Sequence, residues 1–272
     1  MRSFLAIILL ALTITGCKGI NKVLKNPDPE YKLRVAEKYY VQKKYVFAQM
    51  LFEDVLPIYN GRPEFEDIYY KFAYCAYYQN DFLSADYNFK KFLEIFPNSK
   101  RAEEIDYMRA YCFYRQSPKV GLDQTNTQRT IGMMQTFINT HPNSPKNVEA
   151  TGIIDICRKK LEEKDFNSAQ LYYNIGQFHA AAVAFTTLIE DYPESLRTDE
   201  YKLLVIKSYF RYAELSIEEK KRERFEKVID EVNDFTDRFP DSKLLKEAER
   251  YISLSQQNIK NLSIHEQTKT PA

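Results

Sequence analysis

Apolar residues along most of the chain recur every three or four positions, which is the spacing of one face of an α-helix. Four similar segments interrupt this pattern: Phe96-Pro97-Asn98-Ser99, His141-Pro142-Asn143-Ser144, Tyr192-Pro193-Glu194-Ser195 and Phe239-Pro240-Asp241-Ser242. Proline cannot continue the helix before it, and serine is a favourable N-cap for the helix that follows. Because the segment returns at intervals of roughly 45 to 50 residues, the sequence predicts a stacked array of helix pairs.

Small and aromatic residues hold the same relative positions in three of these units. A tetratricopeptide repeat has small residues where its two helices touch and an aromatic residue on its second helix. The matching sets are Ala36, Ala48 and Phe52; Ala73, Ala85 and Phe89; and Ala169, Ala181 and Phe185. Larger side chains at the alanine positions would push the paired helices apart. We therefore predict an all-α fold, a superhelical stack of about five tetratricopeptide-like helix pairs with a C-terminal capping helix.

The predicted pairs are not equally regular. We expect them at residues 31–60, 66–96, 101–141, 165–192 and 196–239, with an additional helix over 147–163 before the fourth pair. The third pair contains a loop over 117–123 that is longer than a regular repeat allows, and the fifth has Val228 and Val232 in place of Ala and Phe. A final helix near 243–258 would cap the array, and the polar segment 259–272 is predicted to be disordered.

The N-terminus has the organisation of a secretory signal peptide. Arg2 precedes a short apolar core that ends in Ile14-Thr15-Gly16, and Cys17 follows directly. The apolar run is much shorter than the roughly 20 residues needed to span a bilayer. A small residue followed by a thiol is the pattern of the bacterial lipobox, although an ordinary signal peptide with an incidental cysteine is the alternative. We predict a signal peptide over 1–16, a covalent lipid such as palmitate on Cys17 and a lipidated linker over 17–30.

Charge and composition exclude some classes of function. The chain has 39 Lys and Arg against 38 Asp and Glu residues, and loss of the signal peptide with Arg2 makes the counts equal. A protein that binds nucleic acid needs a basic surface, so no nucleic-acid partner is expected. Only 7 glycines and no tryptophan are present, which favours helices over sheet folds and phosphate-binding loops. Cys75, Cys112 and Cys157 lie among apolar neighbours, so we expect buried thiols, with a disulfide plus a spare thiol as the alternative.

No group of residues has the spacing of a catalytic site. His141 takes the place of an aromatic residue found in the sister units, His179 lies in a predicted turn and His265 in the predicted tail. The sequence has no histidine pair at metal-binding spacing, no CxxC motif and no glycine-rich phosphate loop. We therefore predict no enzyme activity, no catalytic residue, no metal and no cofactor apart from the covalent lipid on Cys17.

Tyrosines gather at positions that line the concave, ligand-binding side of tetratricopeptide arrays. These positions carry Tyr40, Tyr70, Tyr74, Tyr77, Tyr78, Tyr107, Tyr111, Tyr114 and Arg115. A tyrosine combines an apolar ring with a hydrogen-bonding tip, which suits contact with a protein partner. We predict that the set forms a client-binding groove. The alternative is that these rings fill the gaps between helices.

The lipobox, the short linker and the five irregular units together resemble the BamD family, the outer-membrane lipoprotein of the β-barrel assembly machine. The more specific stretches are Asp106–Ala110, the long loop that follows, His141–Ser144, Ala169–Ala181 and Asp191–Ser195. The tyrosine-rich second unit and the charged run over 218–224 depart from the family.

This resemblance implies a lipid-anchored protein at the periplasmic face of the outer membrane. The N-terminal repeats, 31–141, would bind unfolded β-barrel precursors through their aromatic-rich targeting strand. The C-terminal repeats, 142–258, would dock onto the barrel-forming subunit of the BAM complex. Two alternatives are another periplasmic tetratricopeptide lipoprotein that organises envelope or cell-wall enzymes, and a solute-binding lipoprotein that captures glycans or peptides.

Overall fold

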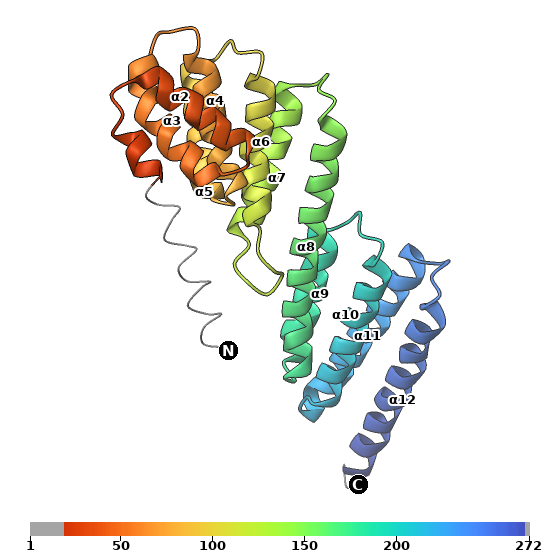
Figure 1. Cartoon of the computed structure of the whole chain (residues 1–272). Helices are drawn as coiled ribbons and strands as arrows, with labels where there is room; N and C mark the ends of the chain where they lie inside the picture. Colours follow the sequence, from red (N-terminus) through yellow and green to blue (C-terminus); the bar gives the residue numbers. More distant parts are fainter. Residues whose placement is uncertain (1–18, 270–272) are drawn as a thin grey trace, which may run out of the picture. The chain divides into compact units, whose positions relative to one another are not determined.

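The computed structural model describes residues 19–269, and the predicted signal peptide and Cys17 lie outside this range. The helices are α2 (Pro29–Val41), α3 (Tyr45–Tyr59), α4 (Phe65–Tyr78), α5 (Phe82–Ile95), α6 (Ala102–Gln116), α7 (Thr125–Thr140), α8 (Asn147–Asn174), α9 (Phe178–Asp191), α10 (Thr198–Glu214), α11 (Glu218–Arg238) and α12 (Leu245–Lys269), as labelled in Figure 1. No strand occurs over 19–269. The all-α prediction is confirmed, with successive helices forming five pairs from α2–α3 to α10–α11 and α12 as the final helix.

The chain divides into two compact units, Met1–Arg158 and Lys159–Ala272. In the first unit, the predicted small and aromatic positions lie between the helices, and Ala36, Ala48, Phe52, Ala85 and Phe89 are all 0% exposed. In the second unit, the equivalent positions of the fourth pair and both valines of the fifth pair are also fully buried. Small side chains at these positions let the paired helices approach closely, because a larger group would overfill the interface.

The serine of each Pro-x-Ser turn holds two parts of its repeat together. Its hydroxyl oxygen accepts a hydrogen bond from the backbone N–H two residues later, at 3.0 Å for Arg101 and 3.1 Å for Lys146, Arg197 and Leu244. The same hydroxyl donates to a carboxylate on the first helix of its pair, near the start of that helix in three cases and in the middle of α8 in the case of Glu162. These donor–acceptor pairs are Ser99–Glu66, Ser144–Glu103, Ser195–Glu162 and Ser242–Asp199. The serine therefore caps the turn that leads into the next helix and has an acidic partner in addition. It is not the N-cap as predicted, because Arg101 holds that position in α6 and Arg197 in α10.

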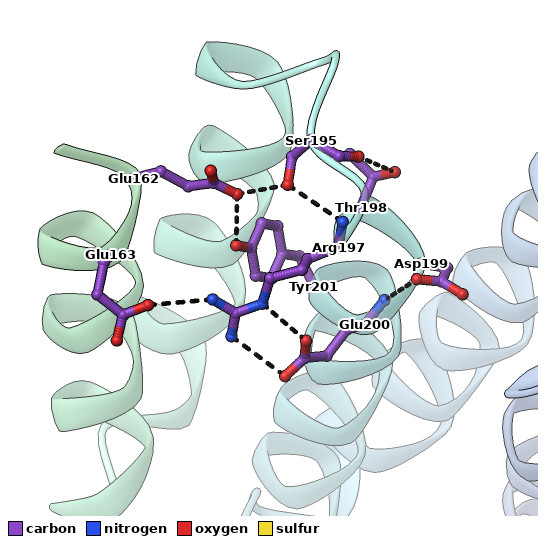
Figure 2. A network of polar contacts seen from close by, with 8 residues as sticks. All are labelled: Glu162, Glu163, Ser195, Arg197, Thr198, Asp199, Glu200 and Tyr201. Carbon is purple, nitrogen blue, oxygen red and sulfur yellow. Dashed lines mark hydrogen bonds and ion pairs between the residues drawn. The ribbon is translucent and has the colours of Figure 1, made fainter. Parts of the chain in front are cut away.

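Figure 2 shows this arrangement at the turn between α9 and α10. The Glu162 carboxylate accepts from the Ser195 hydroxyl and, at 2.7 Å, from the hydroxyl of Tyr201, whose side chain is fully buried. The Arg197 guanidinium forms ion pairs with Glu163 at 3.1 Å and with Glu200 at 2.9 Å. Burial and the Glu162 carboxylate raise the pKa of Tyr201, so its hydroxyl remains a donor. The network fixes the start of α10 against α8.

Three boundaries differ from the sequence prediction. The predicted helix over 147–163 and the first helix of the fourth pair are one helix, α8, because no Pro or Gly separates them. The last helix continues to Lys269, although disorder was predicted from 259. In the predicted linker, residues 19–24 form a short helical turn whose Ile20 and Val23 side chains are buried.

The long loop between α6 and α7 is ordered by its own last residue. The side-chain amide of Gln124, which is 4% exposed, donates to the carbonyl oxygens of Lys119 at 2.9 Å and Leu122 at 3.1 Å. Its carbonyl oxygen accepts from the Thr127 hydroxyl at 2.6 Å. Because the amide satisfies several backbone groups that the loop leaves unpaired, the extra length does not disturb the third pair.

Candidate functional site

The predicted tyrosines lie on the first helices of the first three pairs. Four of them stand on α4 at positions 70, 74, 77 and 78, and three on α6 at 107, 111 and 114. A spacing of three, four, seven or eight residues keeps side chains on one face of a helix. Tyr40, near the end of α2, completes the set. The faces of three neighbouring helices thus supply one aromatic cluster.

Ring contacts connect all eight tyrosines. Along α4, the centroids of Tyr70 and Tyr74 are 4.6 Å apart and those of Tyr74 and Tyr78 are 5.6 Å apart. Along α6, Tyr111 lies 5.9 Å from Tyr107 and 5.6 Å from Tyr114. Between helices, Tyr40 meets Tyr78 at 6.3 Å, and Tyr77 meets Tyr111 at 6.4 Å. Such distances are typical of favourable aromatic pairs.

Exposure separates these rings into two groups. Tyr74 and Tyr107 are only 6% and 3% exposed and belong to the hydrophobic core, so the prediction that they line a groove is corrected. Tyr74 packs against Phe89 at 5.1 Å, and Tyr107 against Phe137 at 5.5 Å. Tyr78 is 44% exposed, and the remaining predicted tyrosines are partly exposed. We call the accessible set the tyrosine surface: Tyr40, Tyr45, Tyr70, Tyr77, Tyr78, Tyr111 and Tyr114.

Tyr45 was not among the predicted residues. It is the first residue of α3, and its ring stacks on Tyr78 with centroids 4.5 Å apart and contacts Tyr40 at 5.7 Å. The positions transferred from tetratricopeptide arrays come from first helices, so a residue of a second helix could not be found by that rule. The tight turn between α2 and α3 was the available signal, because it brings position 45 beside position 40.

Glu104 was also not among the predicted site residues. Its carboxylate accepts hydrogen bonds from the hydroxyls of Tyr70, at 2.8 Å, and Tyr74. Burial, and secondly this carboxylate, raise the pKa of Tyr70 to about 12 and also raise the pKa of Tyr74. Burial also raises the pKa of Tyr40 and Tyr77. These hydroxyls are therefore protonated, neutral donors at physiological pH.

Basic side chains lie at the borders of the cluster. The Arg101 guanidinium stands 4.2 Å from the centre of the Tyr70 ring, and the Lys146 ammonium 5.0 Å from that of Tyr107. The exposed Arg115 lies over Phe82 at 4.7 Å and opposes the rise in the pKa of Tyr77. These cation–π contacts place positive charge beside the aromatic rings. The surface thus combines apolar rings, hydroxyl donors and peripheral cations, which together suit an aromatic peptide.

The second unit contains a different feature, an open pocket of about 720 Å³. It lies where the start of α10 meets the turn between α11 and α12, and Leu196, Leu203, Lys207 and Leu244 are among its lining residues. Leu196, in the preceding turn, is 99% exposed. An apolar side chain so accessible beside a pocket of mixed polarity is a candidate contact for a second protein.

The remaining features considered in the sequence are the cysteines, metal-binding groups and membrane-spanning helices. Cys75, Cys112 and Cys157 are buried, and burial raises the pKa of the Cys75 and Cys112 thiols to about 12. Within the described part of the chain, no three His, Cys, Asp or Glu side chains are placed to hold a metal ion. No helix over 19–269 has the length and apolar character needed to cross a membrane.

Comparison with known proteins gives one family match. The YfiO family, described as an outer membrane lipoprotein, matches residues 28–228. No curated protein matches the chain. Among solved structures, the TPR2AB domain of yeast Sti1 in a complex with pHSP90 is 12% identical, with a TM-score of 0.41, over 84% of this chain and 98% of that chain. A putative kinesin light chain of Podospora anserina with TPR-like repeats is 11% identical, with a TM-score of 0.32, over 80% of this chain and all of that one (100%).

Proposed function

Because the chain belongs to the YfiO family of outer membrane lipoproteins, we propose that it is a non-enzymatic scaffold of the β-barrel assembly machine. In this proposal, Cys17 carries the lipid that anchors the protein at the periplasmic face of the outer membrane. The N-terminal repeats, 31–141, bind unfolded barrel precursors. The C-terminal repeats, 142–258, bind the barrel-forming subunit.

The tyrosine surface is the observation that carries the proposal. An unfolded precursor presents an extended, aromatic-rich targeting strand, and exposed tyrosine rings can bind such a strand by stacking and hydrogen bonding. The stacked pair Tyr45 and Tyr78 offers a flat aromatic contact, and Tyr78 is the most accessible of the predicted rings. Aromatic rings and hydroxyl donors form this surface, so binding should depend on apolar area and hydrogen bonds more than on salt-sensitive charge.

Capture of partners from the native envelope tests this function. The full-length, lipidated protein is purified from detergent-solubilised membranes, and bound proteins are identified by mass spectrometry. We expect the barrel-forming subunit in near-equal amount and unfolded barrel precursors in smaller amounts. A Tyr78→Ala variant should lose the precursors and keep the subunit. Recovery of cell-wall enzymes in place of the barrel-forming subunit would contradict the proposal and favour a different envelope scaffold.

A further inference from the structure

The short helical turn over 19–24 is part of the first repeat. Ile20 is 3% exposed and Val23 is 8% exposed, and both belong to the same hydrophobic cluster as Phe52, Val55 and Tyr59. The backbone N–H of Lys25 donates to the carbonyl oxygen of Asn21 at 3.2 Å, which closes the turn. The chain is therefore fixed to the folded repeat from residue 20 onward, within the segment predicted to be a lipidated linker.

We propose that the first repeat lies directly on the lipid bilayer, with the end of the α2–α3 pair that carries the loop at 60–64 facing the phospholipid headgroups. This inference rests on the proposed acylation of Cys17. Ile20 is three residue steps after Cys17, and a polypeptide spans at most about 3.6 Å per residue. Even a fully extended tether would reach only about 11 Å, which is less than the length of α2.

The topology of the first pair decides which end faces the membrane. The turn over 19–24 leads into α2 at Pro29, so it lies at the N-terminal end of that helix. The helix α3 runs back along α2 and ends at Tyr59, so the loop at 60–64 lies at the same end. Tyr59 shares its cluster with Ile20 and Val23, and the Arg62 guanidinium stands 5.0 Å from the centre of the Tyr59 ring. Val41 lies at the other end of α2, about 20 Å from Pro29, because α2 has 13 residues.

The side chains at this end suit contact with headgroups. Lys22 and Lys25 are exposed on the side of the turn opposite its buried residues, and Arg62 is exposed in the neighbouring loop. Long basic side chains can lay their aliphatic stems on the membrane interface while their charges meet phosphate groups. Asp28, Glu30 and Glu64 stand near Tyr59 at the same end, so the surface carries both signs of charge. The short tether, rather than net charge, therefore holds this end at the bilayer.

Depth-dependent quenching tests the orientation in the full-length, lipidated protein. Single cysteines replace Asn60 at the proposed membrane end and Val41 at the opposite end, and each is labelled with a fluorophore. The protein is reconstituted in vesicles of phosphatidylethanolamine and phosphatidylglycerol that contain a headgroup nitroxide lipid. We expect quenching several-fold stronger at Asn60→Cys than at Val41→Cys. The buried native thiols should stay unlabelled.

A variant with a longer tether provides the control. A Gly/Ser linker of about 12 residues between Lys18 and Gly19 has a mean span of about 20 Å and leaves the packed turn unchanged. The difference between the two labels should then disappear, while peptide binding in solution stays unchanged. Chains that do not float with vesicles would overturn the acylation and the inference together. Chains that float but show equal quenching at both labels, or stronger quenching at Val41→Cys, would overturn the orientation and leave the anchor and the proposed client binding intact.

Discussion

Tyr74 and Tyr78 stand one helical turn apart on α4, yet their environments are different. The Tyr74 ring is enclosed by Phe89 of the following helix and by its neighbours on α4, and its hydroxyl reaches Glu104 on α6. Tyr78 lies close to the end of the helix, where its ring contacts Tyr40 and Tyr45 of the first pair and remains 44% exposed. Residues of one type on one face can therefore differ in role, one in the core and the other at the surface.

Tyr74→Ala should destabilise the first unit. The substitution removes a buried ring and leaves a cavity beside Phe89, at a cost of about 3 kcal/mol or more in the free energy of unfolding. Chemical denaturation followed by circular dichroism measures this change. Tyr74→Phe is the matched control, because it keeps the ring and removes only the hydroxyl that donates to Glu104. A Tyr74→Ala protein as stable as the unmodified chain would contradict the core role of this ring.

Tyr78→Ala should affect binding more than stability. Its ring is 44% exposed, so we expect an unfolding free energy within about 1 kcal/mol of the original value. Loss of an aromatic hot spot commonly costs about 2 kcal/mol in binding, or roughly thirtyfold in affinity. Titration with a labelled barrel-precursor peptide measures the Kd. Tyr172→Ala on α8 is the control, since Tyr172 is also 44% exposed and lies outside the tyrosine surface. Equal affinities for both variants would exclude Tyr78 from the client site.

Sequence reasoning placed the tyrosines on the right helices but could not give their depth. The positions of a tetratricopeptide repeat predict which face of a helix a residue occupies. This prediction was correct, because ring contacts connect all eight predicted tyrosines. Depth depends on the side chains that neighbouring helices bring to that face, such as Phe89 and Phe137, which lie far away in the sequence. For the same reason, the stack of Tyr45 on Tyr78 became visible only in the folded chain.

At the scale of elements, the turns between repeats depend on one hydroxyl. Ser195 caps the start of the next repeat through the Arg197 N–H and also donates to Glu162 at the first helix of its own pair. Its equivalents in three other turns make the same two contacts. In these four turns, a single small side chain thus connects one repeat to the start of the next helix.

Ser195→Ala should lower the stability of the second unit by about 1 kcal/mol, because it removes the hydroxyl that bonds the Arg197 N–H and Glu162, and a typical hydrogen bond contributes roughly 0.5 to 1.5 kcal/mol. The Glu162 carboxylate keeps the Tyr201 hydroxyl as a partner, so the loss should not be larger. Thermal denaturation measures the shift in Tm. Ser168→Ala on α8 is the control, because that hydroxyl is exposed and bonds only a carbonyl of its own helix. Equal Tm values for the two variants would mean that the turn does not depend on its serine.

Element boundaries were predicted well where a residue forces an end and poorly where none does. Each Pro-x-Ser turn ends a helix in the structure, because proline blocks the helix before it. Between 147 and 174 no such residue occurs, and the division of α8 was inferred only from the position of the repeat. The last helix was likewise ended too early because polar composition was interpreted as disorder. The charged and amide residues there are good helix formers, and their apolar neighbours Leu254 and Ile259 pack on the fifth pair.

At the scale of the whole molecule, each of the two units has its own hydrophobic clusters, and each unit has its own proposed role: client binding for the first and docking for the second. The clusters of the first unit carry the tyrosine surface, and those of the second carry the pocket beside Leu196. The helix α8 contributes to both, since Cys157 belongs to a cluster of the first unit and Ala169 to one of the second. The proposed client binding and the proposed docking can be tested by substitutions in separate units, because the tyrosine surface lies in the first unit and the pocket in the second.

The anchor can be tested by mass spectrometry of the protein purified from its native membrane. We expect no peptide from residues 1–16 and an acyl-modified N-terminal Cys17, because the junction Ile14-Thr15-Gly16-Cys17 has a small residue before the thiol. Several acyl chains on one residue would hold the protein firmly, whereas a single chain binds a membrane only marginally. Cys17→Ser is the control and should release the protein into the soluble fraction. An unmodified Cys17 in the mature chain would rule out the anchor.

Leu196→Asp should weaken docking of the barrel-forming subunit by the C-terminal repeats. Leu196 is 99% exposed, so its replacement should change the unfolding free energy by less than about 0.5 kcal/mol. If the side chain is buried at the interface, a carboxylate there loses apolar contact and adds an unpaired charge, which should reduce affinity by about thirtyfold. Co-purification from solubilised envelope, with precursor-peptide affinity measured on the same sample, separates the two roles.

The control is Leu215→Asp, because Leu215 is 68% exposed at the opposite end of α10. We expect Leu196→Asp to lose the subunit and keep the peptide, and Leu215→Asp to keep both. Full recovery of the subunit with Leu196→Asp would exclude this end of α10 from the docking surface.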